Sequence, residues 1–235
     1  MIYLTGDTHG RFGRIQDFCE EYETTKEDLL VILGDVGVNY DGSHYDERLK
    51  ERLSSWPVTF FFVRGNHEEN PENLSTYQEH PYKEGSVLIE EDYPNLLFAK
   101  DGEVYSFNID GKNKRTLVIG GAYSVDKYYR LRRGLKWFPD EQPSDEVKKK
   151  VEKRLSEMNW KIDYVLTHTA PIRYEPREWF IPGIDENTVD KSTEEWLDEI
   201  YGKLTFDKWY CGHYHGEKNV NKLRFMYEGV KLLGE

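Results

Sequence analysis

Residues 58–68 read Val58-Thr59-Phe60-Phe61-Phe62-Val63-Arg64-Gly65-Asn66-His67-Glu68, and they join an apolar run directly to a polar turn. The apolar run follows Pro57 and is β-branched and aromatic, which predicts a buried β-strand. Gly65 allows a sharp exit from that strand. The polar residues after it then stand at the mouth of a sheet, where ligands usually bind.

Four other short apolar runs, at 2–4, 29–33, 164–166 and 209–211, lead into polar motifs of the same kind. These motifs are Gly6-Asp7-Thr8-His9-Gly10, Gly34-Asp35-Val36-Gly37, Thr167-His168 and Gly212-His213-Tyr214-His215. Five predicted strands therefore each end in a residue type that can bind a metal. A turn residue or a core histidine is the alternative for any single motif, but five in a row favour a shared site.

The chain has 235 residues, which allows one large domain or two small ones. The first and last motifs lie near opposite ends of the sequence. One site can use both only if the chain closes on itself, so we expect a single domain over residues 1–235.

The net charge of −12 argues against an extended nucleic-acid footprint, which needs a basic face. A small nucleotide at a metal centre is still compatible with this charge, and solubility is its simplest explanation. Cys19 and Cys211 are too few for a disulfide framework and suit a reducing compartment. The sequence begins without a signal-peptide pattern and has no apolar run of about 20 residues. These features predict a cytoplasmic protein without a membrane partner.

The chain opens with a βαβαβ pattern, which predicts a parallel sheet with right-handed crossovers. After Glu68, the polar segment 69–94 predicts only a short helix at 71–77. The turn Asp110-Gly111-Lys112-Asn113 predicts a hairpin between strands 104–109 and 116–119. The predicted strands are 2–5, 29–33, 58–63, 96–99, 104–109, 116–119, 164–167, 206–211 and 223–227. The predicted helices are 14–23, 41–55, 144–158 and 193–201, and a long loop covers 169–191.

The order of the five motifs resembles the calcineurin-like metallophosphoesterase superfamily. The resemblance implies a four-layer α/β sandwich, in which two mixed β-sheets face each other and helices cover the outside. It also implies two divalent ions with Asp35 shared between them. One ion is expected on Asp7, His9, Asp35 and His215, and the other on Asp35, Asn66, His168 and His213.

The resemblance further implies a hydrolase in which a metal-bridging hydroxide attacks a phosphomonoester or phosphodiester, with Asp35 and His67 as catalytic residues. In the family, the histidine at the position of His67 contacts the phosphate and protonates the leaving oxygen, and Asn66 also contacts substrate. The mixed nitrogen and oxygen ligands favour Mn²⁺, with Fe, Zn or Ni as alternatives, over Ca or Mg. The spacing of Asp7 and His9, and of His213 and His215, suits extended segments whose alternate side chains point the same way.

One departure from the family bears on the substrate. Protein Ser/Thr phosphatases of this superfamily carry Gly-Asp-x-Val-Asp-Arg-Gly at the second motif, whereas this chain has Gly34-Asp35-Val36-Gly37-Val38-Asn39-Tyr40. The symmetrical dinucleoside tetraphosphate hydrolases depend on the same missing residues. The expected substrate is therefore a small phosphoester, with a nucleotide as one candidate. A protein phosphatase-like enzyme and a non-catalytic scaffold of the same fold are the alternatives.

Two further residues are expected in the substrate pocket. Tyr123 follows a predicted strand and the turn Gly120-Gly121, the same local pattern as the ligand motifs. Arg130 lies in the basic and aromatic segment 126–138 and could replace the missing phosphate-binding arginine. Trp179 and Phe180 are expected on a loop that covers the pocket. The alternative for segment 126–138 is an exposed helix paired with acidic side chains.

Overall fold

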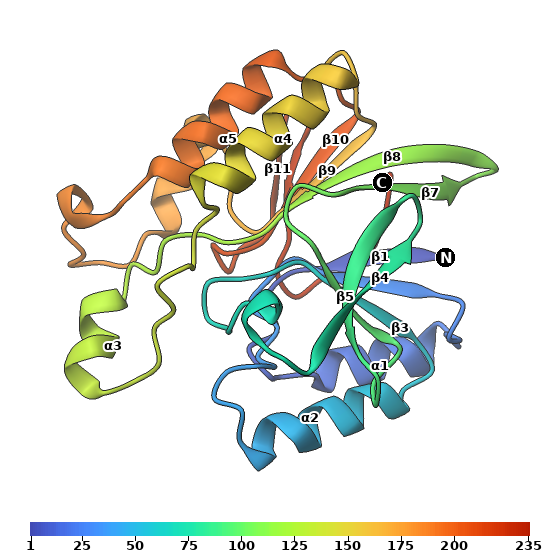
Figure 1. Ribbon diagram of the computed structural model, residues 1–235. Helices are drawn as coiled ribbons and strands as arrows, with labels where there is room; N and C mark the ends of the chain where they lie inside the picture. The colour runs from blue at the N-terminus through green and yellow to red at the C-terminus, as the bar shows by residue number, and fades with distance from the viewer.

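The computed structural model describes residues 1–235 and contains two mixed β-sheets that face each other (Figure 1). The first sheet has seven strands in the order β13-β1-β2-β3-β6-β5-β4, and the second has six in the order β11-β12-β10-β9-β8-β7. The first sheet comprises β1 (Ile2–Thr5), β2 (Leu29–Ile32), β3 (Thr59–Phe62), β4 (Tyr77–Tyr82), β5 (Gly85–Glu90), β6 (Leu96–Ala99) and β13 (Lys231–Leu232). The second comprises β7 (Val104–Ile109), β8 (Lys112–Ile119), β9 (Tyr164–Thr167), β10 (Lys208–Cys211), β11 (Lys218–Val220) and β12 (Leu223–Phe225).

Each sheet has four parallel strands at its centre and antiparallel strands at its edges. In the first sheet β1, β2, β3 and β6 are parallel, and in the second β8, β9, β10 and β12 are parallel. Their apolar residues are buried on both faces, as parallel strands require. The predicted parallel sheet and the hairpin between β7 and β8 are confirmed.

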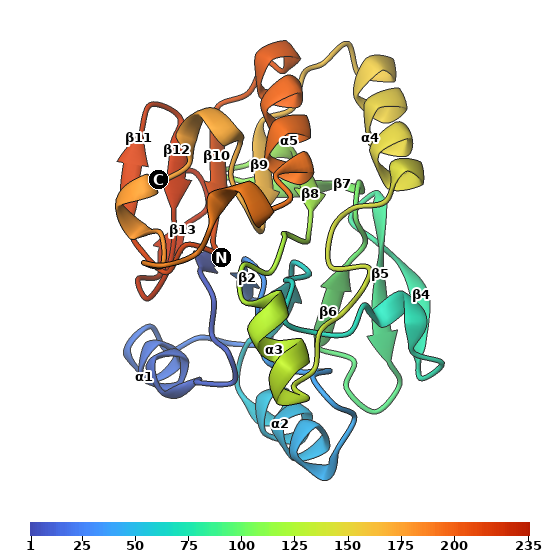
Figure 2. The ribbon, with the colours of Figure 1, turned by 90° about the vertical axis from the view of Figure 1, so that its left-hand side faces the viewer.

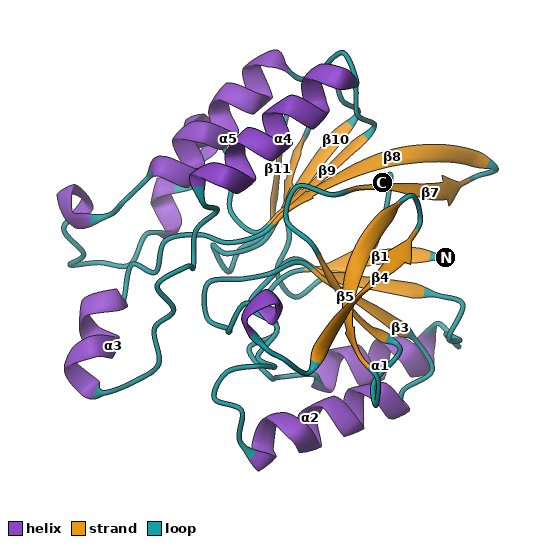
Figure 3. Cartoon of the chain, in the orientation of Figure 1, coloured by secondary structure: helices purple, strands orange, loops and turns teal.

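Five helices lie outside the sheets: α1 (Gly13–Glu21), α2 (His44–Ser55), α3 (Lys127–Arg133), α4 (Asp145–Glu157) and α5 (Ser192–Lys203). In Figure 3, α1 and α2 cover one sheet and α4 and α5 cover the other. Three apolar clusters match this arrangement. One lies under α1 and α2, one between the sheets around Phe61 and Tyr210, and one under α4 and α5 around Trp209. The predicted four-layer sandwich is therefore confirmed.

The segment after Glu68 differs from the prediction. A short 3₁₀ turn occupies Pro71–Asn73, but residues 77–90 form the antiparallel hairpin of β4 and β5, which the sequence did not predict. β4 is the edge strand and exposes most of its side chains, so it lacks the apolar alternation of a half-buried strand. Pro81 is tolerated there because an edge strand has backbone N–H groups that need no partner. The short strands β11 and β13 were also missed.

Helix α3 and the segment 169–191 lie on the side of the molecule where loops leave both sheets, and α3 stands apart from the two helix pairs (Figures 1 and 2). The long loop contains three 3₁₀ turns, at Ile172–Tyr174, Arg177–Trp179 and Glu186–Thr188. None of the helices combines the length and the apolar character needed to cross a bilayer.

Candidate metal centre

The five polar motifs meet beyond the carboxyl ends of the parallel strands, where loops of the two sheets touch. The backbone N–H of His213, after β10, donates to Asp7 Oδ1, after β1, at 2.8 Å. The backbone N–H of Gly212 donates to the carbonyl oxygen of His168 at 2.9 Å. Residues separated by more than 200 positions in the sequence therefore lie in contact here.

Several of the expected ligands lie in turns with a left-handed backbone conformation. The prediction that the Asp7–His9 and His213–His215 segments are extended is wrong, because β1 and β10 end before them. The residues with positive φ are His9 (46°), Asp35 (46°), His213 (69°) and His215 (51°). Such conformations cost roughly 1 kcal/mol or more each in a non-glycine residue, and they concentrate at functional sites.

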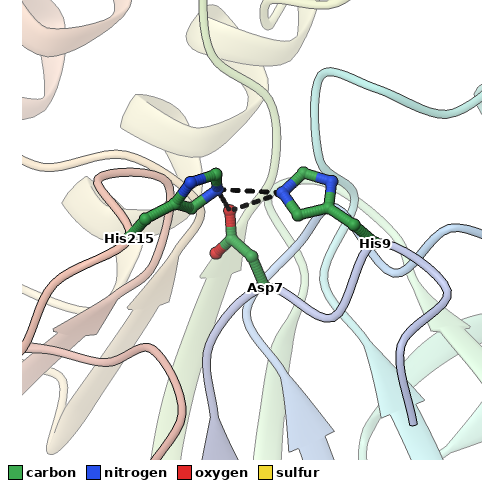
Figure 4. Close-up of side chains that lie close together, drawn as sticks. All are labelled: Asp7, His9 and His215. Atoms are coloured by element: carbon green, nitrogen blue, oxygen red, sulfur yellow. Dashed lines mark hydrogen bonds and ion pairs between the residues drawn. The ribbon is translucent and has the colours of Figure 1, made fainter. Parts of the chain in front are cut away.

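Asp7, His9 and His215 form the solvent-facing half of the site (Figure 4). His9 Nε2 lies 2.8 Å from His215 Nε2, and Asp7 Oδ2 lies 3.8 Å and 3.2 Å from these two nitrogens. The side chains of His9 and His215 are 33 % and 47 % exposed, whereas that of Asp7 is 1 % exposed. The carboxylate of Asp7, 3.2 Å away, raises the pKa of His215, whereas burial lowers the pKa of His9.

Asp35, Asn66 and His168 form the buried half of the site. Asp35 Oδ1 accepts from the backbone N–H groups of Asn66 and His67, each at 2.9 Å, and lies 3.6 Å from His168 Nε2. Burial alone would raise the pKa of Asp35, but the facing histidines, His168 first, lower it overall. Asp35 Oδ2 lies 3.8 Å from His9 Nε2, so this carboxylate stands between the two halves.

His213 completes the buried side less directly. Its ring centroid lies 5.0 Å from that of His168. Two sets of donor atoms lie close enough together to share an ion: Asp7 with His9 and His215, and Asp7 with Asp35 and His168. The nitrogens of His213 belong to neither set. Burial lowers the pKa of His213 to about 3, so the ring is neutral and its lone pair is available. Asp7, like Asp35, lies within reach of both groups.

The hydrogen bonds of His168 show which of its nitrogens can bind a cation. Nδ1 lies 2.7 Å from the carbonyl oxygen of Leu33, which can only accept, so Nδ1 carries the hydrogen and Nε2 of the neutral ring a lone pair. That Nε2 faces Asn66 Oδ1, a second acceptor, at 2.8 Å. Asn66 Nδ2 donates to Ser124 Oγ at 2.9 Å, and Oδ1 is the atom turned toward His168. Two acceptors this close repel each other unless a proton or a cation lies beside both.

Divalent cations fit this donor set. Adjacent nitrogen or oxygen ligands of an ion bonded at about 2.0–2.1 Å stand roughly 3 Å apart. His168 Nε2 and Asn66 Oδ1 have that spacing, and so do His9 Nε2 and His215 Nε2. Asp7 Oδ2 is buried and makes no hydrogen bond, which leaves a charged oxygen for a cation.

Two glycines explain why the motifs approach so closely. A Cβ atom on Gly34 would lie 2.1 Å from His168 Nδ1, and one on Gly65 would lie 2.1 Å from the backbone nitrogen of Asp35. Neither position can carry a side chain without moving a neighbouring motif. The adjoining glycines noted in the sequence therefore serve packing between loops as well as turning.

Glu68 holds the second and third motifs together, a role that the sequence did not reveal. Its carboxylate accepts from the backbone N–H groups of Gly65 at 2.8 Å, Val36 at 2.9 Å and Gly37 at 3.3 Å. Burial raises the pKa of Glu68 to about 8, although these three hydrogen bonds oppose the shift. Ser124, which orients the Asn66 amide, was also missed, because a serine near a glycine turn carries no distinctive signal.

A cavity of about 800 Å³ opens over both halves of the site. It contains His67, whose half-buried ring has Nε2 3.9 Å from Asp35 Oδ2. Tyr123 and Arg130 line the same cavity, so the structure brings all the expected substrate-binding residues together. Arg130 is partly engaged, because its Nε donates to Asp126 at 2.8 Å. The long loop contributes Trp179 and Phe180 to the wall, as expected for a covering loop.

Arg64, which directly precedes the third motif, is not among the residues that line the cavity. Its side chain is buried and donates to Asp101 Oδ2 at 2.8 Å and 3.0 Å and to the carbonyl oxygens of Asp140 and Glu141 at 3.0 Å and 3.2 Å. It therefore joins the loops that carry the third motif and Tyr123 instead of facing substrate.

Comparisons with known proteins agree with this geometry. The sequence profile of the family described as calcineurin-like phosphoesterase matches residues 1–233, whereas no curated protein sequence matches the chain. A phosphopantetheinyl hydrolase from Mycobacterium tuberculosis has a similar structure, with 15 % identity, a TM-score of 0.53 and coverage of 96 % of this chain and 87 % of that one. The protein TT1561 of Thermus thermophilus has 13 % identity, a TM-score of 0.53 and the same coverages.

At these identities, the two solved structures are evidence for the fold alone. The family match is stronger evidence for family membership, because it spans nearly the whole sequence and includes all five polar motifs. The chain therefore belongs to the calcineurin-like phosphoesterase family.

Proposed function

We propose that this protein is a dinuclear, metal-dependent hydrolase of a small phosphomonoester or phosphodiester. The observation that carries the proposal is the pair of acceptors at 2.8 Å, His168 Nε2 and Asn66 Oδ1, inside a cavity also lined by Asp35 and His67. A proton or a cation beside both atoms makes this contact favourable, and the buried, unpartnered Asp7 Oδ2 in the same donor group favours a cation. The family match supports phosphoester hydrolysis as the reaction.

In this proposal the solvent-facing ion is held by Asp7, His9, Asp35 and His215, and the buried ion by Asp35, Asn66, His168 and His213. When bound, such ions polarise a phosphoester and lower the pKa of a water that can attack it. Mn²⁺ is the proposed metal, with Fe, Zn or Ni as alternatives, because nitrogen and oxygen donors are mixed and no thiolate is present. Since the proposed ligands come from both sheets, residues 1–235 are proposed to form a single domain.

The other residues of the cavity have proposed roles in substrate binding and proton transfer. His67 is the proposed general acid, because its ring borders Asp35 without belonging to either donor group. Burial lowers its pKa, and the neighbouring Asp35 carboxylate opposes this shift. Asn66, Tyr123 and Arg130 are proposed to contact the substrate.

The experiment that tests the function combines metal analysis with a substrate panel. Protein stripped with a chelator should be inactive, and adding Mn²⁺ back should restore hydrolysis and about two ions per chain. The panel contains 4-nitrophenyl phosphate, bis(4-nitrophenyl) phosphate, cyclic nucleotides, a phosphopantetheinyl ester and phosphopeptides. The phosphopantetheinyl ester is included because the fold neighbour carries that name.

We expect turnover of small esters and little turnover of phosphopeptides. Faster hydrolysis of the phosphopeptides would favour the protein phosphatase alternative. Two bound ions without hydrolysis of any ester would contradict the enzymatic proposal and favour a scaffold of the same fold.

A further inference from the structure

Arg130 lines the cavity together with His67, and its guanidinium is only partly satisfied by the protein. Nε donates to both carboxylate oxygens of Asp126, at 2.9 Å and 2.8 Å. Nη1 donates to the carbonyl oxygen of Lys136 at 3.2 Å and to the hydroxyl oxygen of Tyr40 at 3.4 Å. Nη2 makes no hydrogen bond within the protein and is not enclosed, so the N–H groups on this nitrogen are open to a ligand.

These three partners come from two parts of the chain. Asp126 and Lys136 flank α3, whereas Tyr40 lies in the loop that follows the second polar motif. The Tyr40 ring packs edge-on against the buried ring of Phe138, with centroids 6.3 Å apart. The guanidinium is therefore held between the α3 segment and the loop of the second motif.

Packing of α3 does little to fix the guanidinium. None of the seven residues of α3 is buried, and a helix of this length is unstable by itself. The segment is tied down just after the helix, where Trp137 Nε1 donates to Glu141 at 2.8 Å and the ammonium of Lys127 lies 4.0 Å from the centre of the indole ring. The direction of the Arg130 side chain therefore depends on its own hydrogen bonds.

The end of the second motif contributes to the cavity only indirectly. Asn39 is buried and donates to the hydroxyl oxygen of Tyr77 at 2.9 Å, and neither Asn39 nor Tyr40 lines the cavity. Residues 34–40 contain no lysine or arginine. What this loop offers is one hydrogen-bond acceptor, the Tyr40 hydroxyl, against Nη1 of Arg130.

A guanidinium at this place suits a phosphoester. Burial lowers the pKa of His67, and the charge of Arg130 lowers it further, so the cation lies close to the proposed general acid. A phosphomonoester presents several charged oxygens besides the one in the scissile bond. The N–H groups of arginine bind such oxygens through charge-assisted hydrogen bonds.

We propose that Tyr40 and Asp126 are positioning residues, which hold Arg130 so that its Nη2 donates to a phosphoryl oxygen of a substrate at the candidate metal centre. The inference rests on the proposed phosphoesterase function. Both residues act through the guanidinium, so the loop of the second motif orients a cation that α3 supplies.

Two variants test these roles in the kinetics of 4-nitrophenyl phosphate and an alkyl phosphate, with Mn²⁺ loaded and metal content measured. Tyr40→Phe removes only the hydroxyl and keeps the ring against Phe138, so kcat/KM should fall about threefold, the effect of one hydrogen bond. Asp126→Asn removes the charged partner of Nε and should lower kcat/KM about fivefold. Each loss should be the same for both esters, because a contact to a phosphoryl oxygen is independent of the leaving group. The exposed Tyr129→Phe and Asp17→Asn are matched controls and should keep the parent values.

A double-mutant cycle and a rescue experiment separate positioning from a purely structural role. In Arg130→Ala, adding Tyr40→Phe or Asp126→Asn should cause no further loss, because the group through which they act is absent. Millimolar guanidinium chloride should partly restore Arg130→Ala, since Asp126 and Tyr40 still form a site for a guanidinium ion. It should restore Arg130→Ala combined with Asp126→Asn much less. Additive losses in the cycle, or equal rescue of the two variants, would overturn the proposal.

Binding of inorganic phosphate distinguishes failure of this proposal from failure of the proposed function. Isothermal titration of the Mn²⁺-loaded protein should give a Kd about tenfold higher for Arg130→Ala and about threefold higher for Tyr40→Phe than for the parent. Circular dichroism and thermal unfolding establish that each variant is folded.

If phosphate binding follows this order but no ester is hydrolysed, the positioning role stands and the enzymatic function falls. If the parent binds phosphate no more tightly than Arg130→Ala, the proposal is overturned. It is also overturned if Tyr40→Phe and Asp126→Asn leave phosphate binding unchanged.

Discussion

The two halves of the candidate metal centre use the same residue types but are supported differently. In the buried half, His168 is fully covered and hydrogen-bonded to Leu33, and Asp35 is held by two backbone N–H groups. In the solvent-facing half, His9 and His215 are 33 % and 47 % exposed; their rings contact each other and Asp7, and His215 also stacks on Tyr227. The protein therefore fixes one set of ligand atoms before any ion binds, whereas the other set depends more on the ion itself.

This difference predicts that folding is coupled mainly to the buried half. Removing a ligand there leaves a buried group without its partner, whereas removing an exposed ligand leaves a group that water can reach.

Asp35→Asn should have the largest effect, because Asp35 stands between the halves. A neutral amide removes one negative charge from both proposed ion sites, so both ions should be lost and kcat/KM should fall by about 10³-fold. Metal content per chain and steady-state kinetics would be measured together, with the exposed Asp17→Asn as control. A variant that keeps one ion at full occupancy would place Asp35 in one half only.

His67→Gln should keep the metals and change the dependence on the leaving group. An alkoxide needs a proton much more than a nitrophenolate does. The variant should therefore lose about 10²-fold on an alkyl phosphate and less than tenfold on 4-nitrophenyl phosphate. His44→Gln is the control, because His44 is 89 % exposed on α2. Equal losses on the two esters would show that His67 is not the acid.

His168→Ala and His215→Ala compare the halves directly in the metal-free protein. His168→Ala removes a buried ring and its hydrogen bond to Leu33, so the free energy of unfolding should fall by about 3 kcal/mol. His215→Ala should change it by no more than about 0.5 kcal/mol, as expected for an exposed side chain. Urea unfolding in the presence of a chelator would measure both. Similar destabilisation by the two variants would abolish the distinction between the halves.

Arg130→Ala concerns the rim of the cavity and should have the smallest effect. The guanidinium is partly committed to Asp126, so we expect a loss of about tenfold in kcat/KM, or about 1.4 kcal/mol, with metal content unchanged. Arg132→Ala, exposed on the same helix, should leave the kinetics unaltered. A loss of less than twofold for Arg130→Ala would remove Arg130 from the proposed substrate contacts.

Local patterns predicted the central strands well and the edges poorly. β1, β6, β7 and β9 have the predicted bounds, because each is a short segment dominated by apolar residues and ends before a turn. The β4–β5 hairpin was missed because its edge strand is mostly exposed, so the prediction of a loop with a short helix over segment 69–94 was wrong. The bounds of the predicted helices differ by up to three residues from those observed, because capping and packing compete at helix ends.

The sequence by itself determined which residue types end the strands and in what order, and hence the family and the chemistry of the ligands. That information is local, because each motif follows its own apolar run and glycine. Only the tertiary structure decided what depends on contacts between distant residues. It buries Arg64 between loops, places the carboxylate of Glu68 against three N–H groups and buries Glu194 Oε2 without a hydrogen-bond partner. An acidic residue in the first turn of a helix has the same sequence pattern whether it faces water or the interior, so its burial is decided only when the chain has folded.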